Sequence, residues 1–240
     1  MINNKSSFMK GLLLLVSFAA VFVVIMTPVF PTDSGKKENG LHYADDLFNK
    51  LSKGSSYFIP EVQKKVDGLA GKQIDLAVTV KKADKAADAA KVFTAAGMTA
   101  TAEGEILKVK GDLGALLSAT VKDADSMYHN DAAAVSARYG MEAADAMEAS
   151  WEAYAGMIKA LQKAKLIPES QAVDMVMKKA IEPGYNFYGI NAAKVTDKMG
   201  IMTGLLVFYV IYTMWYGFAI FELFEGIGLT MKKSKVKQEA

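Results

Sequence analysis

The sequence lacks cysteine and holds very little histidine, and these two absences exclude much of familiar enzyme chemistry. Without cysteine among 240 residues there are no disulfides, thiol nucleophiles, iron–sulfur clusters or cysteine-bound zinc. Histidine occurs only as His42 and His129, which excludes histidine-rich metal centres. No phosphate-binding glycine motif, serine nucleophile elbow or HExxH motif is present. We therefore expect no catalytic residue and no cofactor in this chain.

Arginine and an excess of charge are also missing. Among 28 basic residues only Arg138 is an arginine, and the formal net charge is +2. Proteins that bind nucleic acid usually have a strongly basic surface and use arginine to contact phosphates and bases. Nucleic acid is therefore not an expected partner.

What the sequence does have is two long apolar blocks near its ends. Residues 11–30 carry no charge, and twenty residues of helix extend about 30 Å, the thickness of a bilayer's hydrocarbon core. A cleaved signal peptide is the alternative, but its apolar region is usually shorter and ends in a small-residue site. We interpret residues 11–30 as a transmembrane helix that stays uncleaved.

The second apolar block covers residues 199–229 and is interpreted as a second transmembrane helix. Gly200 and Gly204 form a GxxxG pattern, which permits close approach of another helix. Trp215 lies in mid-span, where packing against a helix is a better explanation than an aromatic belt at the membrane surface. These three residues are candidate interface residues.

Lysines outside the two blocks predict the orientation. Lys5 and Lys10 precede the first block, and a basic tail over residues 230–240 follows the second. Positive flanks remain in the cytoplasm, whereas long loops are translocated largely regardless of charge. We expect a plasma (inner) membrane protein in contact with membrane lipid. Residues 1–10 and 230–240 would then be cytoplasmic, and residues 31–200 extracytoplasmic.

The expected fold class is α+β, a mostly helical extracytoplasmic domain with a small βαββα layer between the two spans. A linker over residues 31–42 precedes an α+β part over residues 43–130. Hydrophobic periodicity and turn residues predict its helices at 43–53, 60–69, 84–96 and 112–128, and its strands at 74–80, 98–102 and 106–110. The first two strands are expected to be parallel neighbours joined by a right-handed crossover.

Residues 131–198 are expected to be helical throughout. One apolar stripe predicts a helix of over twenty residues, either facing the core or forming a subunit interface: Met141, Ala144, Met147, Trp151, Tyr154, Ile158 and Leu161. A further helix opens at Pro168 and is expected to end at residues 182–184.

An aromatic hexapeptide over residues 185–190 follows, and it contains Tyr185, Phe187 and Tyr188. We expect a non-helical segment that either seals the domain or docks a partner subunit or the membrane interface. Asn191 is the expected N-cap of the helix that continues into the second span.

Two pairs of ionisable residues have both a functional and a structural interpretation. Asp125 and His129 lie four positions apart on a predicted helix, a spacing that suits two metal ligands but is also common in surface pairs. Glu222 and Glu225 lie three apart near the end of the second span. Intramembrane carboxylates usually face protein or water, so these two lie either among headgroups or against a partner helix or proton path.

These observations favour a non-enzymatic accessory or scaffold subunit of a membrane complex, assembled with other membrane subunits or with itself. The alternative is an extracytoplasmic ligand sensor that signals through a separate transducing subunit. An enzyme that uses carboxylates or a weak metal site is a third class, which the sequence does not exclude.

Overall fold

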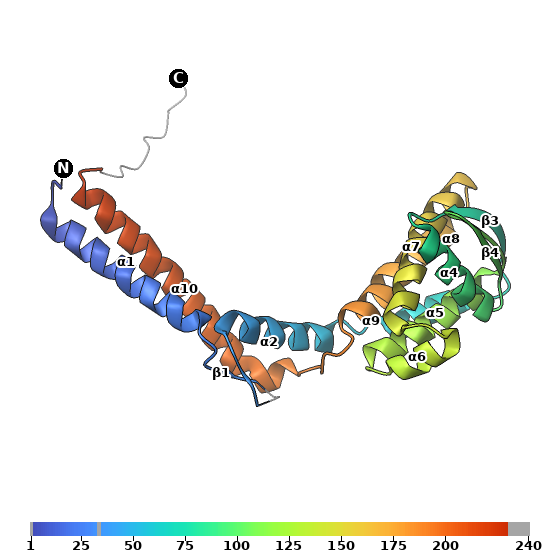
Figure 1. The fold of residues 1–240 in the computed structure, drawn as a ribbon, viewed down its shortest axis with the longest axis horizontal. Helices are drawn as coiled ribbons and strands as arrows, with labels where there is room; N and C mark the ends of the chain where they lie inside the picture. The colour runs from blue at the N-terminus through green and yellow to red at the C-terminus, as the bar shows by residue number, and fades with distance from the viewer. Residues whose placement is uncertain (1, 33–34, 230–240) are drawn as a thin grey trace, which may run out of the picture. The chain divides into compact units, whose positions relative to one another are not determined.

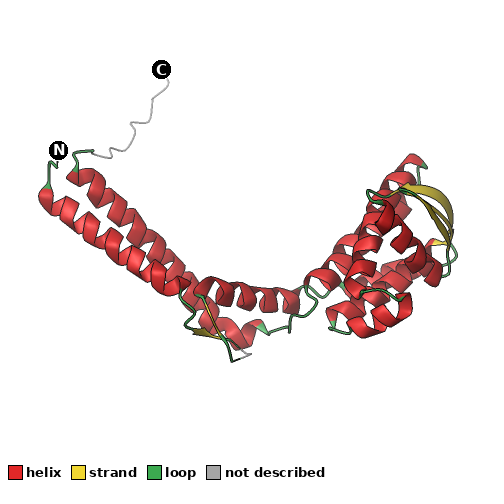
Figure 2. Cartoon of the chain, in the orientation of Figure 1, coloured by secondary structure: helices red, strands yellow, loops and turns green. Residues whose placement is uncertain are grey.

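The computed structural model describes residues 2–32 and 35–229, so the basic tail over residues 230–240 lies outside the described residues. The chain forms two compact units. One contains residues 1–51 and 193–240, and the other contains residues 52–192. The fold class is α+β, as expected, with mostly helical structure and small sheets (Figure 2).

Two antiparallel helices, α1 (Lys5–Met26) and α10 (Val195–Gly226), dominate the first unit (Figure 1). Both are long and apolar enough to cross a membrane, as the sequence predicted. Helix α1 begins before the apolar block because the Asn4 side chain caps it, accepting hydrogen bonds from the amides of Ser6 and Ser7. It ends at Met26, before Pro28.

The two helices touch where their side chains are small. A Cβ atom on Gly11 would lie 2.6 Å from the Leu223 amide nitrogen and 2.9 Å from the Ala219 carbonyl oxygen. A Cβ atom on Gly226 would lie 2.7 Å from Phe8. These glycines let the backbones approach closely near the start of α1 and the end of α10.

The expected linker after the first span contains structure. Strands β1 (Phe30–Pro31) and β2 (Lys37–Glu38) form a short antiparallel ladder. Helix α2 (Gly40–Ser55) follows, and the Asn39 side chain accepts a hydrogen bond from the His42 amide at its start. It therefore begins three residues before the expected Tyr43.

The second unit contains a three-stranded sheet of β3 (Gln73–Thr79), β4 (Thr99–Glu103) and β5 (Ile106–Asp112). The strand order is β3-β5-β4 and both pairs are antiparallel. The first two strands are parallel to each other, but the expectation that they are neighbours is wrong because β5 lies between them. Leu107 and Val109 of β5 are buried, whereas β4 has no buried residue and suits an edge.

Helices cover this sheet and complete a continuous hydrophobic core. Helices α4 (Ala83–Ala95) and α7 (Ala143–Lys163) contact the strands directly. A Cβ atom on Gly156 would lie 2.7 Å from the Val78 side chain, so a side chain there would push α7 away from β3. The remaining helices of the layer are α3 (Ile59–Asp67), α5 (Leu113–Tyr128), α6 (Ala132–Tyr139) and α8 (Ile167–Val176).

Helix α7 has the expected length of over twenty residues and faces the core, but its buried face differs from the predicted stripe. Met147, Tyr154 and Leu161 are buried as expected. Met141 precedes the helix, Ala144 is exposed, and Trp151 and Ile158 are half-buried. Besides Ser150 and Met157, the remaining buried positions are alanines, which allow the close packing that larger residues prevent: Ala143, Ala146, Ala149 and Ala153.

The expected helix end at residues 182–184 is wrong. Helix α8 continues through a π-helical turn, η1 (Met177–Ile181), into α9 (Glu182–Asn186). The Glu182 amide donates to the Met177 carbonyl, five residues back. In a regular α-helix the Pro183 ring would clash with the carbonyl four residues back, so the wider turn lets the helix pass through this proline.

The predicted N-cap of α10 is also wrong. The helix starts at Val195 after an extended Lys194. Asn191 instead accepts a hydrogen bond from the Asn130 side chain at 3.4 Å.

Candidate functional site

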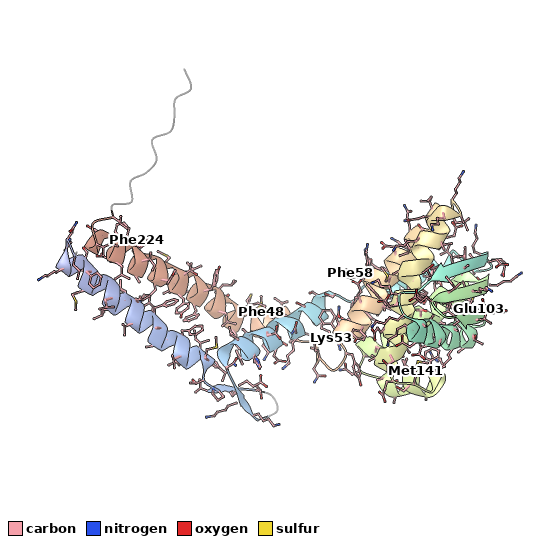
Figure 3. All side chains as sticks on the ribbon, turned by 45° about the horizontal axis from the view of Figure 1, so that its top comes forward. Phe48, Lys53, Phe58, Glu103, Met141 and Phe224 are labelled. Carbon is pink, nitrogen blue, oxygen red and sulfur yellow. The ribbon has the colours of Figure 1, made fainter. Side chains whose placement is uncertain are left out.

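The aromatic hexapeptide is held against the second unit by a buried lysine, Lys53, at the C-terminal end of α2 (Figure 3). Its ammonium group donates to the carbonyls of Phe187 and Ile190, at 3.0 and 2.6 Å, and to the Asn130 side chain at 3.2 Å. The Tyr128 ring lies 5.0 Å away. Burial lowers the pKa of Lys53, because removal from water disfavours its charged form.

The three aromatic residues of the hexapeptide divide between core and surface. Phe187 packs against the core, and its ring centre lies 6.0 Å from that of Tyr128. Tyr185 and Tyr188 are 45% and 44% exposed. The segment is not wholly non-helical, because Tyr185 and Asn186 belong to α9. It therefore combines an internal anchor with two exposed rings.

A pocket of about 320 Å³ opens between α7 and α9, and we call it the α7–α9 pocket. Seven residues line it: Met147, Glu148, Trp151, Ile181, Glu182, Tyr185 and Asn186. Met147 and Ile181 are almost fully buried. The pocket thus combines apolar, aromatic and acidic side chains.

Hydrogen bonds fix the two carboxylates of this pocket. The Trp151 indole donates to Glu182 at 3.1 Å. Glu148 lies 2.7 Å from the ammonium group of Lys85, which also contacts Asp145 at 3.2 Å. The hydrogen bond to Glu148 raises the pKa of Lys85, so the lysine remains charged and offsets one of the two pocket carboxylates.

The weak metal-ligand candidates, Asp125 and His129, do come together. Their closest side-chain atoms, Nδ1 and Oδ1, are 3.2 Å apart at the surface. The Tyr57 hydroxyl also donates to Asp125 at 2.7 Å. Among residues 2–32 and 35–229 no group of three or more histidine, aspartate or glutamate side chains is placed to hold a metal ion.

Two nearby aspartates stabilise the fold through hydrogen bonds. Buried Asp123 accepts hydrogen bonds from Arg138 and from the Tyr139 hydroxyl. Asp131 caps α6 by accepting from the Ala134 amide. The sole arginine therefore has a structural role, joining α6 to α5.

The ionisable and aromatic candidates of α10 divide between two faces. Glu222 lies between Ala219 and Gly226, the residues that pack on α1. One oxygen of Glu222 is buried without a hydrogen-bond partner, as is the Trp215 indole nitrogen. Glu225 is exposed. Helical spacing thus places Glu222, but not Glu225, on the side that faces α1.

Gly200 and Gly204 do not contact α1. A Cβ atom on either would meet nothing within 4 Å. The GxxxG pattern therefore remains available for a helix from outside this chain.

An apolar groove of about 680 Å³ lies in the first unit, lined by α1, α2 and α10. Aromatic rings form much of its wall: Phe22, Phe30, Tyr43, Phe48, Phe208, Tyr209 and Tyr212. The described lining residues carry no charged side chain. A groove of this composition suits hydrocarbon.

The sequence pattern gives no signal for the burial of Lys53 or for the Trp151–Glu182 pair. Lys53 ends an amphipathic helix and resembles a solvated terminal lysine, so only the fold reveals its burial. The apolar stripe predicts only that Trp151 faces the core or a subunit interface. The pairing of Trp151 with Glu182 depends on the π-helical turn, for which the sequence offers Pro183 as the only signal.

Comparison with family models, curated proteins and solved structures finds no significant match to this chain. The fold and site therefore define only a class: an α+β protein with two helices long and apolar enough to span a membrane.

Proposed function

We propose that this chain is a two-span membrane protein that acts as a non-enzymatic accessory or scaffold subunit of a membrane complex. The observation that supports this proposal most is the outer surface of the helix pair. In the most apolar 18-residue stretch of each helix, only 6% is buried within the chain. An apolar surface of this size needs hydrocarbon or other helices to cover it.

The groove of the first unit agrees with a membrane location. Lipid acyl chains would cover the part of its uncharged lining that α1 and α10 supply, and α2 would lie at the membrane surface. We further propose the plasma (inner) membrane, with both termini in the cytoplasm and residues 31–200 outside it. The lysines that flank the apolar blocks support this orientation.

Assembly is proposed to use α10 and the exposed rings of the aromatic hexapeptide. Gly200 and Gly204 offer a small-residue face that nothing in the described chain covers. Tyr185 and Tyr188 expose aromatic surface of the kind enriched in protein interfaces. The partner is another membrane subunit or a second copy of this chain.

Native mass spectrometry after mild-detergent extraction from the source membrane tests this proposal. We expect the chain to co-purify with other membrane subunits, and Gly204→Leu to dissociate the complex by blocking close helix approach. Gly217→Leu is the matched control. Gly217 is also a glycine of α10 with open space around it, but it points about 140° away from Gly204.

Three outcomes distinguish the versions of the proposal. A homo-oligomer alone would contradict the hetero-complex and direct attention to self-assembly. Equal assembly of both variants would remove the GxxxG face from the interface. A monomer without any partner would contradict the scaffold function.

The α7–α9 pocket favours a second candidate function, a ligand sensor that signals through a separate transducing subunit. A concave site with few polar groups is the usual form of a small-molecule site. A ligand-dependent change in the co-purifying subunits would favour this alternative.

A further inference from the structure

We propose that the α7–α9 pocket binds a small organic cation. This inference goes beyond the scaffold function and does not depend on it, although Tyr185 belongs to both the proposed docking surface and the pocket rim. The site lies wholly within the second unit, and its chemistry is independent of the two membrane helices.

The acidic lining of the pocket favours a ligand with a positive charge. No basic side chain lines it, whereas Glu148 and Glu182 both do. Lys85 neutralises Glu148 at 2.7 Å, but Glu182 has no ion-pair partner among the described residues. Its one hydrogen bond comes from the neutral Trp151 indole. The exposed Lys178 acts on Glu182 only beyond ion-pair distance and is itself paired with Asp174, so the pocket still disfavours an anion.

The aromatic rings favour an organic cation over a metal ion. Trp151 already attracts one ammonium group from outside the pocket, since Lys81 lies 5.8 Å from its ring centre. Tyr185 adds a second ring at the rim. Weakly hydrated ammonium groups bind to such faces. A metal ion would instead need more oxygen ligands than two separated carboxylates provide.

The size and apolar floor of the pocket limit the ligand further. About 320 Å³ equals the volume of about ten water molecules at about 30 Å³ each. The floor of Met147 and Ile181 suits methyl groups better than a bare ammonium ion. A small methylated amine therefore fits best.

The wall that carries Glu182 and Tyr185 follows directly after the π-helical turn. Turns of this type occur frequently at functional sites, because they redirect side chains from the regular helical path. The turn accommodates Pro183 and also places Glu182 and Tyr185 on the pocket wall, which agrees with a binding site here but does not select its ligand.

The test uses the purified full chain in detergent and choline as the probe. 3,3-Dimethylbutan-1-ol is the matched neutral probe, because a tert-butyl group replaces the trimethylammonium group. In a Trp215→Phe background, the fluorescence of Trp151 reports binding at the pocket. We expect saturable binding of choline that is at least tenfold tighter than that of the neutral alcohol, and calorimetry should agree.

Variants then assign the site. Glu182→Gln should weaken choline binding by about tenfold, which corresponds to about 1.4 kcal/mol. Glu103→Gln removes the same charge from an exposed position on β4 and should leave binding unchanged (Figure 3). If Glu182→Gln fails to fold, Tyr185→Ala provides the test, because this exposed ring should be lost without damage to the core.

Equal affinity for the two probes would overturn the proposal and indicate an apolar slot without charge selectivity. An absence of saturation with choline would also overturn it. Glycerophosphocholine distinguishes the source of the cation. Binding as tight as that of choline indicates a lipid headgroup, whereas binding of choline alone indicates a free solute.

Discussion

Arg138 shows how a single residue's role depends on its partner. Asp123 is almost fully buried and its side chain is 3% exposed, whereas that of Arg138 is 43% exposed. A buried carboxylate is costly unless it is paired, so the arginine and the Tyr139 hydroxyl make its burial tolerable.

We therefore predict that Arg138→Met lowers the free energy of unfolding by about 2 kcal/mol. This value is below the usual cost of breaking a fully buried pair, because solvent screens the exposed guanidinium. Denaturant unfolding in detergent measures it. Lys91→Met is the control, since it removes an exposed pair with Asp88 and should change stability by under about 0.5 kcal/mol. Similar values for the two variants would contradict the structural role of Arg138.

The raised pKa values of two tyrosines predict that the protein loses stability at alkaline pH. Burial, followed by the hydrogen bond to Asp125, raises the pKa of Tyr57 to about 12. Burial also raises the pKa of Tyr154. Each folded-state pKa exceeds the unfolded value near 10, so the stabilisation is complete below about pH 10. For Tyr57 it is lost as the pH rises from about 10 to about 12.

We expect the denaturant concentration at the midpoint of unfolding to decrease as the pH rises from about 10 to about 12. Tyr154→Phe should reduce the slope of this fall, because the unfolded variant no longer ionises at that position. Comparison of the two proteins cancels the titration of lysines in the same range. An unchanged slope in Tyr154→Phe would show that Tyr154 does not contribute.

At the scale of elements, sequence predicted what depends on local pattern. The two apolar helices and the βαββα order follow from hydrophobic period and turn residues, and the structure confirms them. The order of the strands in the sheet cannot be predicted from hydrophobic period and turn residues. The alternation of Leu107 and Val109 predicts that β5 is a strand, but its central position results from pairing with β3 on one edge and β4 on the other, which no local pattern specifies.

The pocket was unpredictable for a related reason. Pro183 normally ends a helix, and the chain instead passes through it by widening one turn. That choice depends on the packing of η1 and α9 against α5 and α7. Trp151 and Glu182 are 31 residues apart, so no local period relates them.

At the scale of the whole molecule, the absence of cysteine makes the proposed topology directly testable. Single cysteines at Asn3 and Thr101, both exposed, are the only reactive thiols in their variants. We predict that a membrane-impermeant maleimide labels Thr101→Cys in intact cells, and labels Asn3→Cys only after permeabilisation. The reverse pattern would contradict the proposed orientation, and equal labelling in intact cells would contradict a membrane barrier between the two sites.

The antiparallel pairing of α1 and α10 has a consequence for synthesis. The Tyr212 hydroxyl donates to the Phe18 carbonyl across 194 positions of sequence. At about 5–20 residues per second, a ribosome needs roughly 10–40 s to add the residues between them. Throughout that interval α10 is not available to pack on α1, and the intervening domain emerges first. We therefore expect the antiparallel pair of α1 and α10 to form last in folding. Until then, the largely uncharged α1 lacks its α10 partner.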